Sequence, residues 1–297
     1  QLRELDNKSS QLKSDAIDTA AQVLAVAPVD ITDIAVLKKG MTNRSFMFKS
    51  GDAKYIMRIP GEGTDKLINR SQEAQVYAAL SGKGICDDPV YINPENGYKI
   101  TEFLEGIRVC DPLDVNDLEK CMALLRRFHE MKLKVEHEFD IFGQIEFYES
   151  LWDGKPSVYK DYAKTKANVL TLKPYIESHI TEKVLTHIDA VPDNFLFYDR
   201  GNGEELQLTD WEYAGMQDPH VDIAMFCIYS LYDQSQVDQL IDIYFEGKCP
   251  DDTRVKIYCY IASCGLLWSN WCEYKRNLGV EFGEYSLRQY RYAKEYF

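Results

Sequence analysis

Apolar residues recur at helical spacing near the start of the chain. Behind Ser14, a residue type that commonly caps helices, positions 17, 20, 21, 24 and 27 are apolar until Pro28 ends the pattern. This spacing predicts a helix over residues 14–27 whose apolar face packs on the first part of the fold. Residues 1–13 are polar and predict either a frayed helix or a linker.

Shorter apolar stretches follow and predict strands, while helical spacing returns further along the chain. The predicted strands are 34–37, 45–48, 55–59, 90–92 and 98–104, separated by turn residues at 39–43, 50–52 and 93–97. Helices are predicted at 71–80, at 115–131 behind the cap Asp114, and once between 137 and 175. The pattern thus predicts an α+β fold with an N-terminal helix or linker (1–30), a small antiparallel-sheet lobe (31–104) and a mostly helical lobe (105–297).

The stretch from 186 to 213 carries the strongest chemical signal. Asn194 follows Asp189 after four intervening residues, and Asp210 comes one predicted hairpin later. Alternating apolar and polar residues at 194–199 and 206–211 flank a glycine-bearing turn, which predicts the two strands of that hairpin. The hairpin would return Asp210 to the side of Asn194. The same order and first gap occur in the catalytic loop of protein kinases.

These residue types suit phosphoryl transfer. The transition state carries its charge on phosphoryl oxygens, so the protein mainly positions groups and supplies cations. The oxygens of Asn194 and Asp210 are the hard ligands that Mg²⁺ prefers, and Asp189 would accept the proton of the attacking hydroxyl. Taken singly, these residues are ordinary turn and cap residues. His187 is typical of a packed scaffold residue, and Asp222 is placed to cap or brace this loop.

Candidate nucleotide contacts lie in the first lobe. The turn containing Gly40, Thr42 and Asn43 is where a small kinase lobe covers the phosphates with backbone amides, although alone it is an ordinary hairpin turn. Arg58 ends the apolar strand YIMRI, where a lone cation is unexpected without a partner. Glu73 is the predicted partner, and a surface ion pair is the alternative. The backbone of residues 102–104 would hydrogen-bond an adenine.

The acceptor signal comes from aromatic residues near the end of the chain. Trp268, Trp271 and Tyr274 recur three apart on one helical face, and Tyr285 and Tyr290 follow. An aromatic stripe at this spacing usually belongs to a core. A quaternary ammonium group, however, cannot be hydrogen-bonded and is held out of water by aromatic faces and nearby carboxylates. Such contacts contribute about 0.5 to 2 kcal/mol per ring.

Composition narrows the possible partners. The chain has 297 residues, 34 Lys and Arg against 48 Asp and Glu, and a net charge of -14, which disfavours nucleic acid and anionic membranes as partners. No apolar run approaches the length of a membrane span. The eight cysteines show no CxxC pair, which favours a reducing cytoplasm. Because the sequence begins at Gln1 rather than Met, we expect a further segment, such as another domain, before it.

With these residues collected, the chain resembles the choline/ethanolamine kinases of the bacterial type, within the aminoglycoside-phosphotransferase-like branch of the protein-kinase fold. The resemblance runs from about Leu37 to Tyr290, nearly the whole chain. It rests on the segments KGMTN, YIMRI, LINRSQE, HIDAVPDN, DWEYAGMQDPHVDIA, WSNWCEYK and EFGEY. It implies a two-lobed kinase-like fold, ATP and Mg²⁺ as cofactors, and choline as the substrate.

The resemblance also implies a role for each matching residue. Asp189 matches the catalytic base, and Asn194 and Asp210 match the magnesium ligands. The nucleotide contacts that it implies are Lys39, Gly40, Thr42, Asn43, Arg58, Glu73, Glu102, Phe103 and Leu104. The acceptor contacts are Asp189 itself, the carboxylate Glu212 and the rings of Tyr213, Tyr229, Trp268, Trp271 and Tyr285.

Two positions depart from the family pattern. Lys39 stands where the family commonly has a glycine, which would stiffen the phosphate loop. Tyr229 stands where many choline kinases carry a Glu facing the cation, so the acceptor site is expected to be more aromatic and less charged. The leading hypothesis is therefore an ATP- and Mg²⁺-dependent choline kinase. The alternatives are a kinase for ethanolamine, another small aminoalcohol or an aminoglycoside, and a nucleotide-binding regulatory pseudokinase without catalysis.

Overall fold

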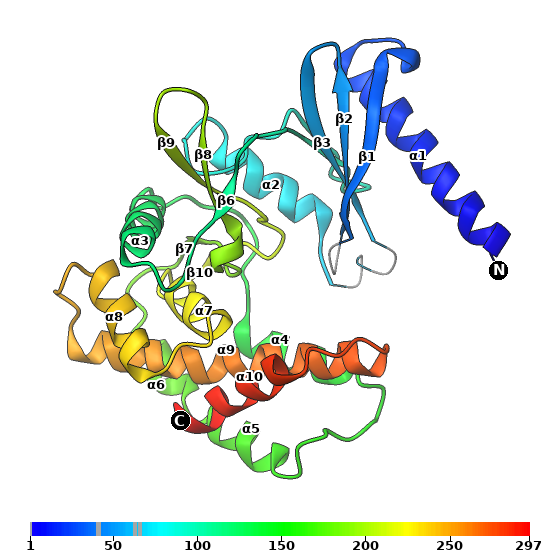
Figure 1. The fold of residues 1–297 in the computed structure, drawn as a ribbon. Helices are drawn as coiled ribbons and strands as arrows, with labels where there is room; N and C mark the ends of the chain where they lie inside the picture. The colour runs from blue at the N-terminus through cyan, green and yellow to red at the C-terminus, as the bar shows by residue number, and fades with distance from the viewer. Residues whose placement is uncertain (1, 40–42, 62–63, 65–66) are drawn as a thin grey trace. The chain divides into compact units, whose positions relative to one another are not determined.

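The computed structural model describes residues 2–39, 43–61, 64 and 67–297, which form an α+β fold (Figure 1). The chain divides into two compact units. Unit 1 comprises Gln1–Ile107 and Tyr198–Asn202, and unit 2 comprises Arg108–Phe197 and Gly203–Phe297. Unit 1 contains an antiparallel sheet and unit 2 is mostly helical, which confirms the predicted fold class.

An antiparallel sheet of order β1-β2-β3-β5-β4 forms the centre of unit 1. Its strands are β1 (Ile31–Lys39), β2 (Asn43–Ser50), β3 (Ala53–Pro60), β4 (Tyr91–Ile92) and β5 (Lys99–Glu102). β1 begins three residues before the predicted strand. Register shifts between Thr32 and Ala35 and between Val36 and Lys38 interrupt the alternation from which its start was predicted. In the centre of the sheet, Arg58 pairs with Ser45 on one side and Lys99 on the other.

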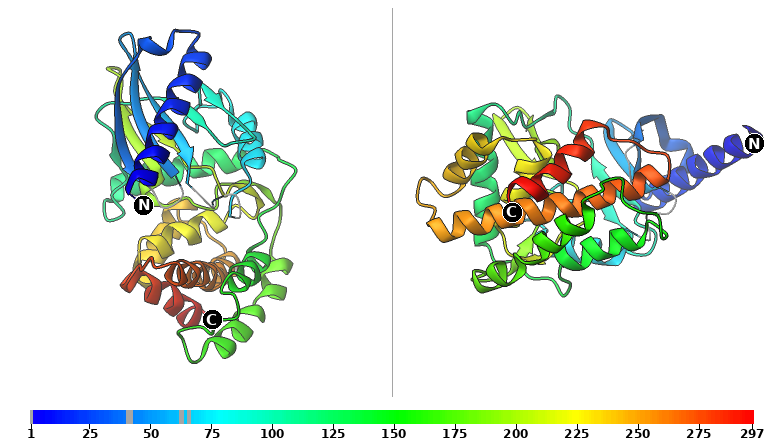
Figure 2. Two further views of the ribbon diagram at one scale, coloured as in Figure 1. Left: turned by 90° about the vertical axis from the view of Figure 1, so that its right-hand side faces the viewer. Right: turned by 90° about the horizontal axis from the view of Figure 1, so that it is seen from below.

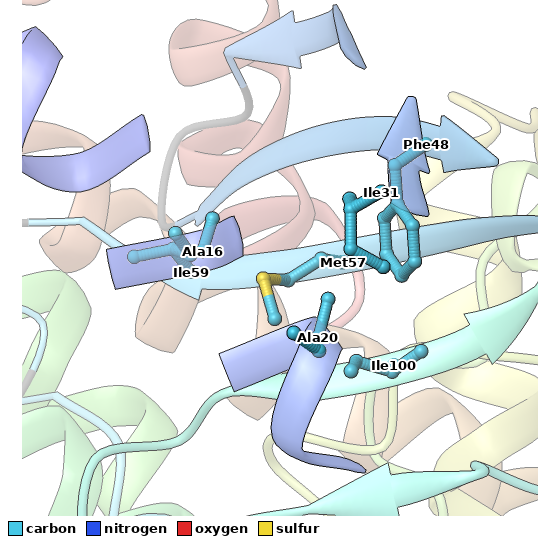
Figure 3. Packing of buried hydrophobic residues seen from close by; sticks show 8 residues of the cluster. Ala16, Ala20, Ile31, Phe48, Met57, Ile59 and Ile100 are labelled. Carbon is cyan, nitrogen blue, oxygen red and sulfur yellow. The ribbon is translucent and has the colours of Figure 1, made fainter. Parts of the chain in front are cut away.

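Helix α1 (Leu2–Leu24) packs on this sheet through small side chains. Ala16, Ala20 and Ala21 are buried, and their size lets the helix approach the strands closely. Figure 3 shows Ala16 and Ala20 at this contact. They meet Met57 and Ile100, which are both 0% exposed, and burying side chains of this size contributes about 1.5–3 kcal/mol each. The helix begins near the start of the chain, so of the two predictions for residues 1–13 the helix is the correct one. A short 3₁₀ turn, Pro28–Asp30, leads from α1 into β1.

Helix α2 (Arg70–Leu80) carries the other chemically important residues of unit 1. Its start is fixed by Asn69, whose side chain accepts a hydrogen bond of 3.0 Å from the amide of Gln72. Both Arg70 and Glu73 lie in the first turn and are buried, although charged residues rarely are. The cap therefore sets the point on the helix at which these two charges turn inward.

Helices make up most of unit 2. They are α3 (Val115–Glu130), α4 (Ile141–Ser150), α5 (Tyr162–Leu170), α6 (Lys173–Ser178), α7 (Val221–Tyr229), α8 (Gln234–Tyr244), α9 (Asp251–Asn277) and α10 (Glu284–Glu295). The prediction of one helix between 137 and 175 was wrong, because α4, α5 and α6 are short and lie among aromatic and charged residues without a sustained period. In the described residues, no helix combines the length and the apolar character needed to cross a bilayer.

The long helix α9 is the centre of unit 2, with α4, α7 and α10 packed against it (Figure 2). Its residues from Cys259 to Cys272 are buried without interruption. Gly265 lets α10 cross closely, since a Cβ there would lie 2.8 Å from the carbonyl oxygen of Gln289 and from Cβ of Tyr292. Trp268 and Trp271 are therefore held on a helix that the rest of the unit surrounds.

Short strands complete unit 2. They are β6 (Arg108–Val109), β7 (Val184–Thr186), β8 (Phe195–Asp199), β9 (Glu204–Leu208) and β10 (Gly215–Gln217). The sheets have the orders β6-β8-β9 and β10-β7. The predicted hairpin exists, but Asn194 belongs to a 3₁₀ turn, Pro192–Asn194, and Asp210 lies beyond β9. Pro192 favours that turn, and Asp210 adopts a φ of +61°, which a strand does not accommodate.

Candidate active site

The loop after β7 is braced from helix α7. Asp222, which is fully buried, accepts hydrogen bonds from the backbone amides of His187 (3.1 Å) and Ile188 (2.8 Å). Its carboxylate also lies 2.7 Å from Nε2 of His129. Ile188 has a φ of +73°, a strained value for a β-branched residue. The predicted bracing role of Asp222 is confirmed, and His129 is the structural helix residue that holds it.

His187 serves as a scaffold inside the same loop. Its Nδ1 accepts a hydrogen bond of 3.1 Å from the amide of Asp189, and its Nε2 lies 2.8 Å from the carbonyl oxygen of Thr209. One nitrogen must accept and the other must donate, so these partners fix a neutral ring protonated at Nε2. The ring also packs edge-on to Trp211 at 4.4 Å between centroids. The predicted scaffold role is therefore confirmed.

The ends of the predicted catalytic motif lie beside one another. The amide of Thr209 donates a hydrogen bond of 2.9 Å to the carbonyl oxygen of Asn194, so Asp210 follows directly after a residue bonded to Asn194. Nδ2 of Asn194 donates to the carbonyl oxygen of Asp189 at 2.8 Å. This bond fixes the orientation of the Asn194 amide relative to the loop. The hairpin thus brings the three residues together, as the spacing predicts.

Desolvation and like charges both act on Asp189 in this group. Burial, and then the negative charges of Asp210 and Glu212, raise the pKa of Asp189 well above that of an ordinary Asp, while a hydrogen bond from Asn194 opposes the shift. The carboxyl group of Asp189 therefore holds a proton more readily than usual. A cation near the three carboxylates would relieve their repulsion.

These residues fit a magnesium ion whose other ligands come from a substrate and water. In the part of the chain that the structure describes, no three His, Cys, Asp or Glu side chains form a metal cage. Mg²⁺, however, usually keeps several waters and takes only one or two protein oxygens, with substrate phosphates completing its shell. The carboxylate of Asp210 and the amide oxygen of Asn194 would supply two such ligands.

Aromatic rings form a continuous series near these carboxylates. Trp268 packs edge-on to Trp271 at 5.7 Å and to Tyr213 at 5.6 Å, measured between ring centroids. The series continues from Trp271 through Phe282 and Tyr285 to Tyr229, with successive distances of 5.2, 6.5 and 6.0 Å. The two indoles are mostly buried, with 9% and 7% exposed. All five predicted acceptor rings therefore belong to one aromatic group.

A cation already lies against this group. Nζ of Lys275 lies 5.7 Å from the centroid of the Trp271 ring, and burial lowers the pKa of that lysine. Tyr229, at the last position of α7, donates a hydrogen bond to the carboxylate of Asp193 next to the catalytic motif. The charge of Asp189 contributes to the raised pKa of both Tyr229 and Tyr285, after burial as the main cause. These rings therefore lie within electrostatic range of Asp189.

Sequence reasoning missed two members of this neighbourhood. Phe282 joins Trp271 to Tyr285, and the only sequence signal for it was its place in the EFGE segment beside Tyr285. Tyr148 of α4 packs on Trp268 at 6.3 Å, and its pKa is raised by burial and then by the charge of Asp189. It lies 41 positions before Asp189 in a segment without a clear period, so no local signal could have found it.

Unit 1 holds the predicted charged pair. Arg58 and Glu73 form two parallel hydrogen bonds of 2.6 Å, with side chains 5% and 0% exposed. Burial alone would raise the pKa of Glu73, but the hydrogen bond from Arg58 and the charges of Arg58, Lys99 and Arg70 hold it below its ordinary value. The pair is thus a buried bidentate ion pair and not the surface pair considered as the alternative.

The structure describes only some of the other residues that are predicted to bind the nucleotide. Gly40 and Thr42 lie outside the described residues, and only the backbone of Lys39, at the end of β1, is described. The side chain of Asn43 accepts a hydrogen bond of 3.0 Å from Arg70. At the predicted adenine segment, Glu102 ends β5 and the amide of Phe103 donates to the carbonyl oxygen of Lys54 at 3.0 Å. An adenine would therefore have to use other backbone groups, such as those of Leu104.

Comparisons with known proteins point in one direction. A family model described as choline/ethanolamine kinase matches residues 34–259. Protein LicA of Haemophilus influenzae is 26% identical over 263 residues, which cover 84% of this chain and 96% of that protein. The crystal structure of choline kinase LicA from Streptococcus pneumoniae has a TM-score of 0.81 and 27% identity, covering 96% of this chain and 98% of that chain. A structure of LicA in complex with AMP has a TM-score of 0.75 and 28% identity, covering 90% and 91%.

Proposed function

We propose, on the premise that this chain belongs to the choline/ethanolamine kinase family, that it transfers the γ-phosphoryl group of ATP to the hydroxyl of choline and releases ADP and phosphocholine. The observation that carries the proposal is that a braced loop and the hairpin after it bring Asp189, Asn194 and Asp210 together, within electrostatic range of an aromatic group. The first feature suits phosphoryl transfer and the second suits a positively charged alcohol.

Asp189 is assigned the role of base. The hydroxyl oxygen of the acceptor forms the new bond to phosphorus, the bond from phosphorus to the ADP oxygen breaks, and the hydroxyl proton passes to Asp189. Its raised pKa favours that last step, because a carboxyl with neighbouring negative charges holds a proton well. Mg²⁺ bound by Asn194 and Asp210 would neutralise charge on the phosphates. Arg58 of unit 1, which is held by Glu73, is assigned the role of binding the phosphates of ATP.

Choline is preferred because the candidate acceptor site consists largely of rings. A quaternary ammonium offers no hydrogen-bond donor, and aromatic faces hold such a cation without one. Ethanolamine is the second candidate, since its primary ammonium would gain from a carboxylate such as Glu212, whose charge acts on Asp189. An aminoglycoside would require a broad acidic surface and not two adjacent indoles. A regulatory role without catalysis is disfavoured, because the base and both proposed metal ligands are present.

The experiment is a measurement of ADP release with choline, ethanolamine, an aminoglycoside or no acceptor, in the presence and absence of Mg²⁺. We expect turnover that requires Mg²⁺ and is fastest with choline, together with phosphocholine as a product identified by mass. Turnover with ethanolamine alone would replace choline as the substrate. ATP binding without turnover on any acceptor would favour the regulatory alternative.

We place this activity in the cytoplasm, where ATP is available. The eight cysteines all have free thiols, and seven of them are buried. This arrangement suits a reducing compartment. The proposed partner is a small cationic alcohol, and the acidic surface implied by the net charge of -14 disfavours nucleic acid and anionic membranes.

A further inference from the structure

Two arginines share one carboxylate in unit 1. Besides the two bonds from Arg58, the carboxylate of Glu73 lies 3.4 Å from Nη1 of Arg70. All three side chains are nearly excluded from solvent, with exposed fractions of 5%, 7% and 0% for Arg58, Arg70 and Glu73. Arg58 alone already satisfies Glu73 with ideal geometry. The second arginine therefore needs another reason to be buried, because removing a guanidinium from water is costly.

The second terminal nitrogen of the Arg70 guanidinium explains why this side chain is buried. Its Nη2 donates a hydrogen bond of 3.0 Å to the side-chain oxygen of Asn43. Asn43 is the first residue of β2, and Arg70 is the first residue of α2. One guanidinium thus connects Asn43 with Glu73, and through Glu73 it is connected with Arg58. The sequence assigns both residues to the nucleotide: Asn43 through the backbone amides of its turn, and Arg58 through its side chain.

The turn before β5 is shaped around both arginines. Nη2 of Arg58 donates a hydrogen bond of 2.7 Å to the carbonyl oxygen of Gly97. A Cβ at Gly97 would lie 2.6 Å from Cδ of Arg70 and 2.8 Å from Pro60, and the φ of Gly97 is +74°. No side chain fits in that space or favours that conformation. The absence of a side chain at this position is therefore required for the two arginines to lie as they do.

One carboxylate connects two buried cations in this cluster. Among the residues whose burial the structure describes in unit 1, the buried charges are Arg58, Arg70, Lys99 and Glu73. Lys99 pairs with Asp87 at 3.0 Å, so Glu73 is the carboxylate that Arg58 and Arg70 have in common. A change at Arg70 therefore acts on the carboxylate that holds Arg58.

We propose that Arg70 is a positioning residue for the nucleotide, which fixes Asn43 and, through the shared Glu73 carboxylate, Arg58 at one spacing. The inference rests on the proposed use of ATP, and it does not depend on which alcohol is phosphorylated. Arg70 acts through its two partners and is not assigned a contact with the phosphates. A surface pair between Arg70 and Glu73, three residues apart on a helix, would need neither the burial nor the bond to Asn43.

The test measures binding of Mg²⁺-ATP by calorimetry without any acceptor. Arg70→Met and Asn43→Ala should each weaken binding about tenfold, because each removes the same charge-assisted hydrogen bond. The double variant should weaken it by clearly less than the product of the two effects, since the partners are coupled. Arg70→Lys should recover only part of the loss, because an ammonium lacks the fork that reaches both partners. In turnover assays, the KM for ATP should rise while that for the acceptor stays within about twofold.

Lys49→Met is the matched control, because it removes an exposed ion pair with Asp33 in the same sheet. It should leave ATP binding unchanged. If Arg70→Met lowers the melting temperature but leaves ATP affinity equal to that of the control, the residue is only structural and the proposal is wrong. If Arg70→Met does not fold, Asn43→Ala and Arg70→Lys decide in the same way. A wild-type protein that binds ATP but phosphorylates no choline refutes the proposed function, while the effect on ATP binding still judges this proposal.

Discussion

Unit 1 buries the carboxylate of Glu73 and unit 2 half-buries that of Asp189, and the two carboxylates have opposite surroundings. Glu73 lies against two guanidinium groups, which hold its pKa below the ordinary value despite burial. Asp189 lies near the charges of Asp210 and Glu212, which add to the effect of burial and raise its pKa. The ionised form of a carboxylate is therefore stabilised in unit 1 and destabilised in unit 2.

The ion pairs of Glu73 are complete within the protein, whereas the charges around Asp189 are balanced only when ligands bind. Removing Glu73 would leave two buried cations without their partner, so the sequence is constrained there by stability. Asp189 is held by the bracing of Asp222 and His187 in spite of its own electrostatic cost. Proteins keep such unfavourable groups where function needs them. Substitutions of the two carboxylates should consequently have opposite effects on stability.

The largest effect is expected for Asp189→Asn. Without a carboxylate to accept the proton and orient the hydroxyl, kcat should fall by about 10²–10⁴-fold. ATP binding should be largely retained. The melting temperature should rise, because the substitution removes one of several repelling charges from a half-buried position. Kinetics and thermal unfolding of the same preparation check both statements. A fully active variant would remove Asp189 from the mechanism, and a lower melting temperature would contradict the electrostatic comparison.

Glu73→Gln should produce the opposite pattern. Breaking a buried ion pair by removing one partner costs about 3–5 kcal/mol, and here both Arg58 and Arg70 lose the charge they share. We therefore expect a clear loss in the free energy of unfolding, measured by urea denaturation, together with weaker ATP binding. Glu105→Gln is the control, since Glu105 pairs with Lys54 at an exposed position and should change stability little. Equal stability of the two variants would show that the buried pair is not what holds unit 1 together.

The pH dependence of stability distinguishes the two carboxylates further. The pKa of Glu73 is lowered in the folded state, so its contribution is present above the ordinary pKa of about 4 and is lost as the pH falls. The pKa of Asp189 is raised, so its ionisation destabilises the fold increasingly as the pH rises through that higher value. The stability gained by Asp189→Asn should thus grow with pH, whereas the loss in Glu73→Gln should shrink towards acidic pH. Melting temperatures between pH 4 and 8 give both trends, and parallel curves would contradict the comparison.

A smaller effect is expected in the aromatic group of unit 2. Trp271→Ala removes a ring that contributes about 0.5 to 2 kcal/mol to holding a cation, so the KM for choline should rise by up to about 30-fold. The KM for ATP should change far less. Trp271→Phe should restore much of the effect, because it keeps an aromatic face. Tyr159→Leu is a control, since Tyr159 stacks on Tyr290 in the same unit outside the aromatic group. Equal changes in both KM values would show that Trp271 does not belong to the acceptor site.

Local patterns predicted what local physics determines. The order Asp189, Asn194, Asp210 and the alternation around the glycine turn were enough to predict that a hairpin brings these residues together. The partner of Arg58 was predictable because a cation on an apolar strand needs one. The bulged start of β1 and the left-handed conformation of Asp210 could not be predicted, since both depend on pairing that forms only in the folded sheets. Tyr148 gave no local signal, because its partner Trp268 is distant in sequence. Arg70 and Phe282 were not predicted either, although Glu73 and Tyr285 follow them by three residues, because their contacts with Asn43 and Trp271 depend on the fold.

Tyr148 allows the smallest and most discriminating test of this contrast. In the described part of the chain its hydroxyl is buried without a hydrogen-bond partner, while the ring packs on Trp268. A buried hydroxyl that lacks a partner costs about 1–3 kcal/mol, so Tyr148→Phe should leave the free energy of unfolding equal or raise it by about 1 kcal/mol. Tyr292→Phe is the matched control, because the hydroxyl of Tyr292 donates a bond of 2.8 Å to the carbonyl oxygen of Tyr232, and its loss should destabilise by about 1 kcal/mol. Urea denaturation of both variants measures the difference. Equal losses would mean that the Tyr148 hydroxyl is satisfied in solution, and unit 2 would then be as fully paired around its aromatic group as unit 1 is around Glu73.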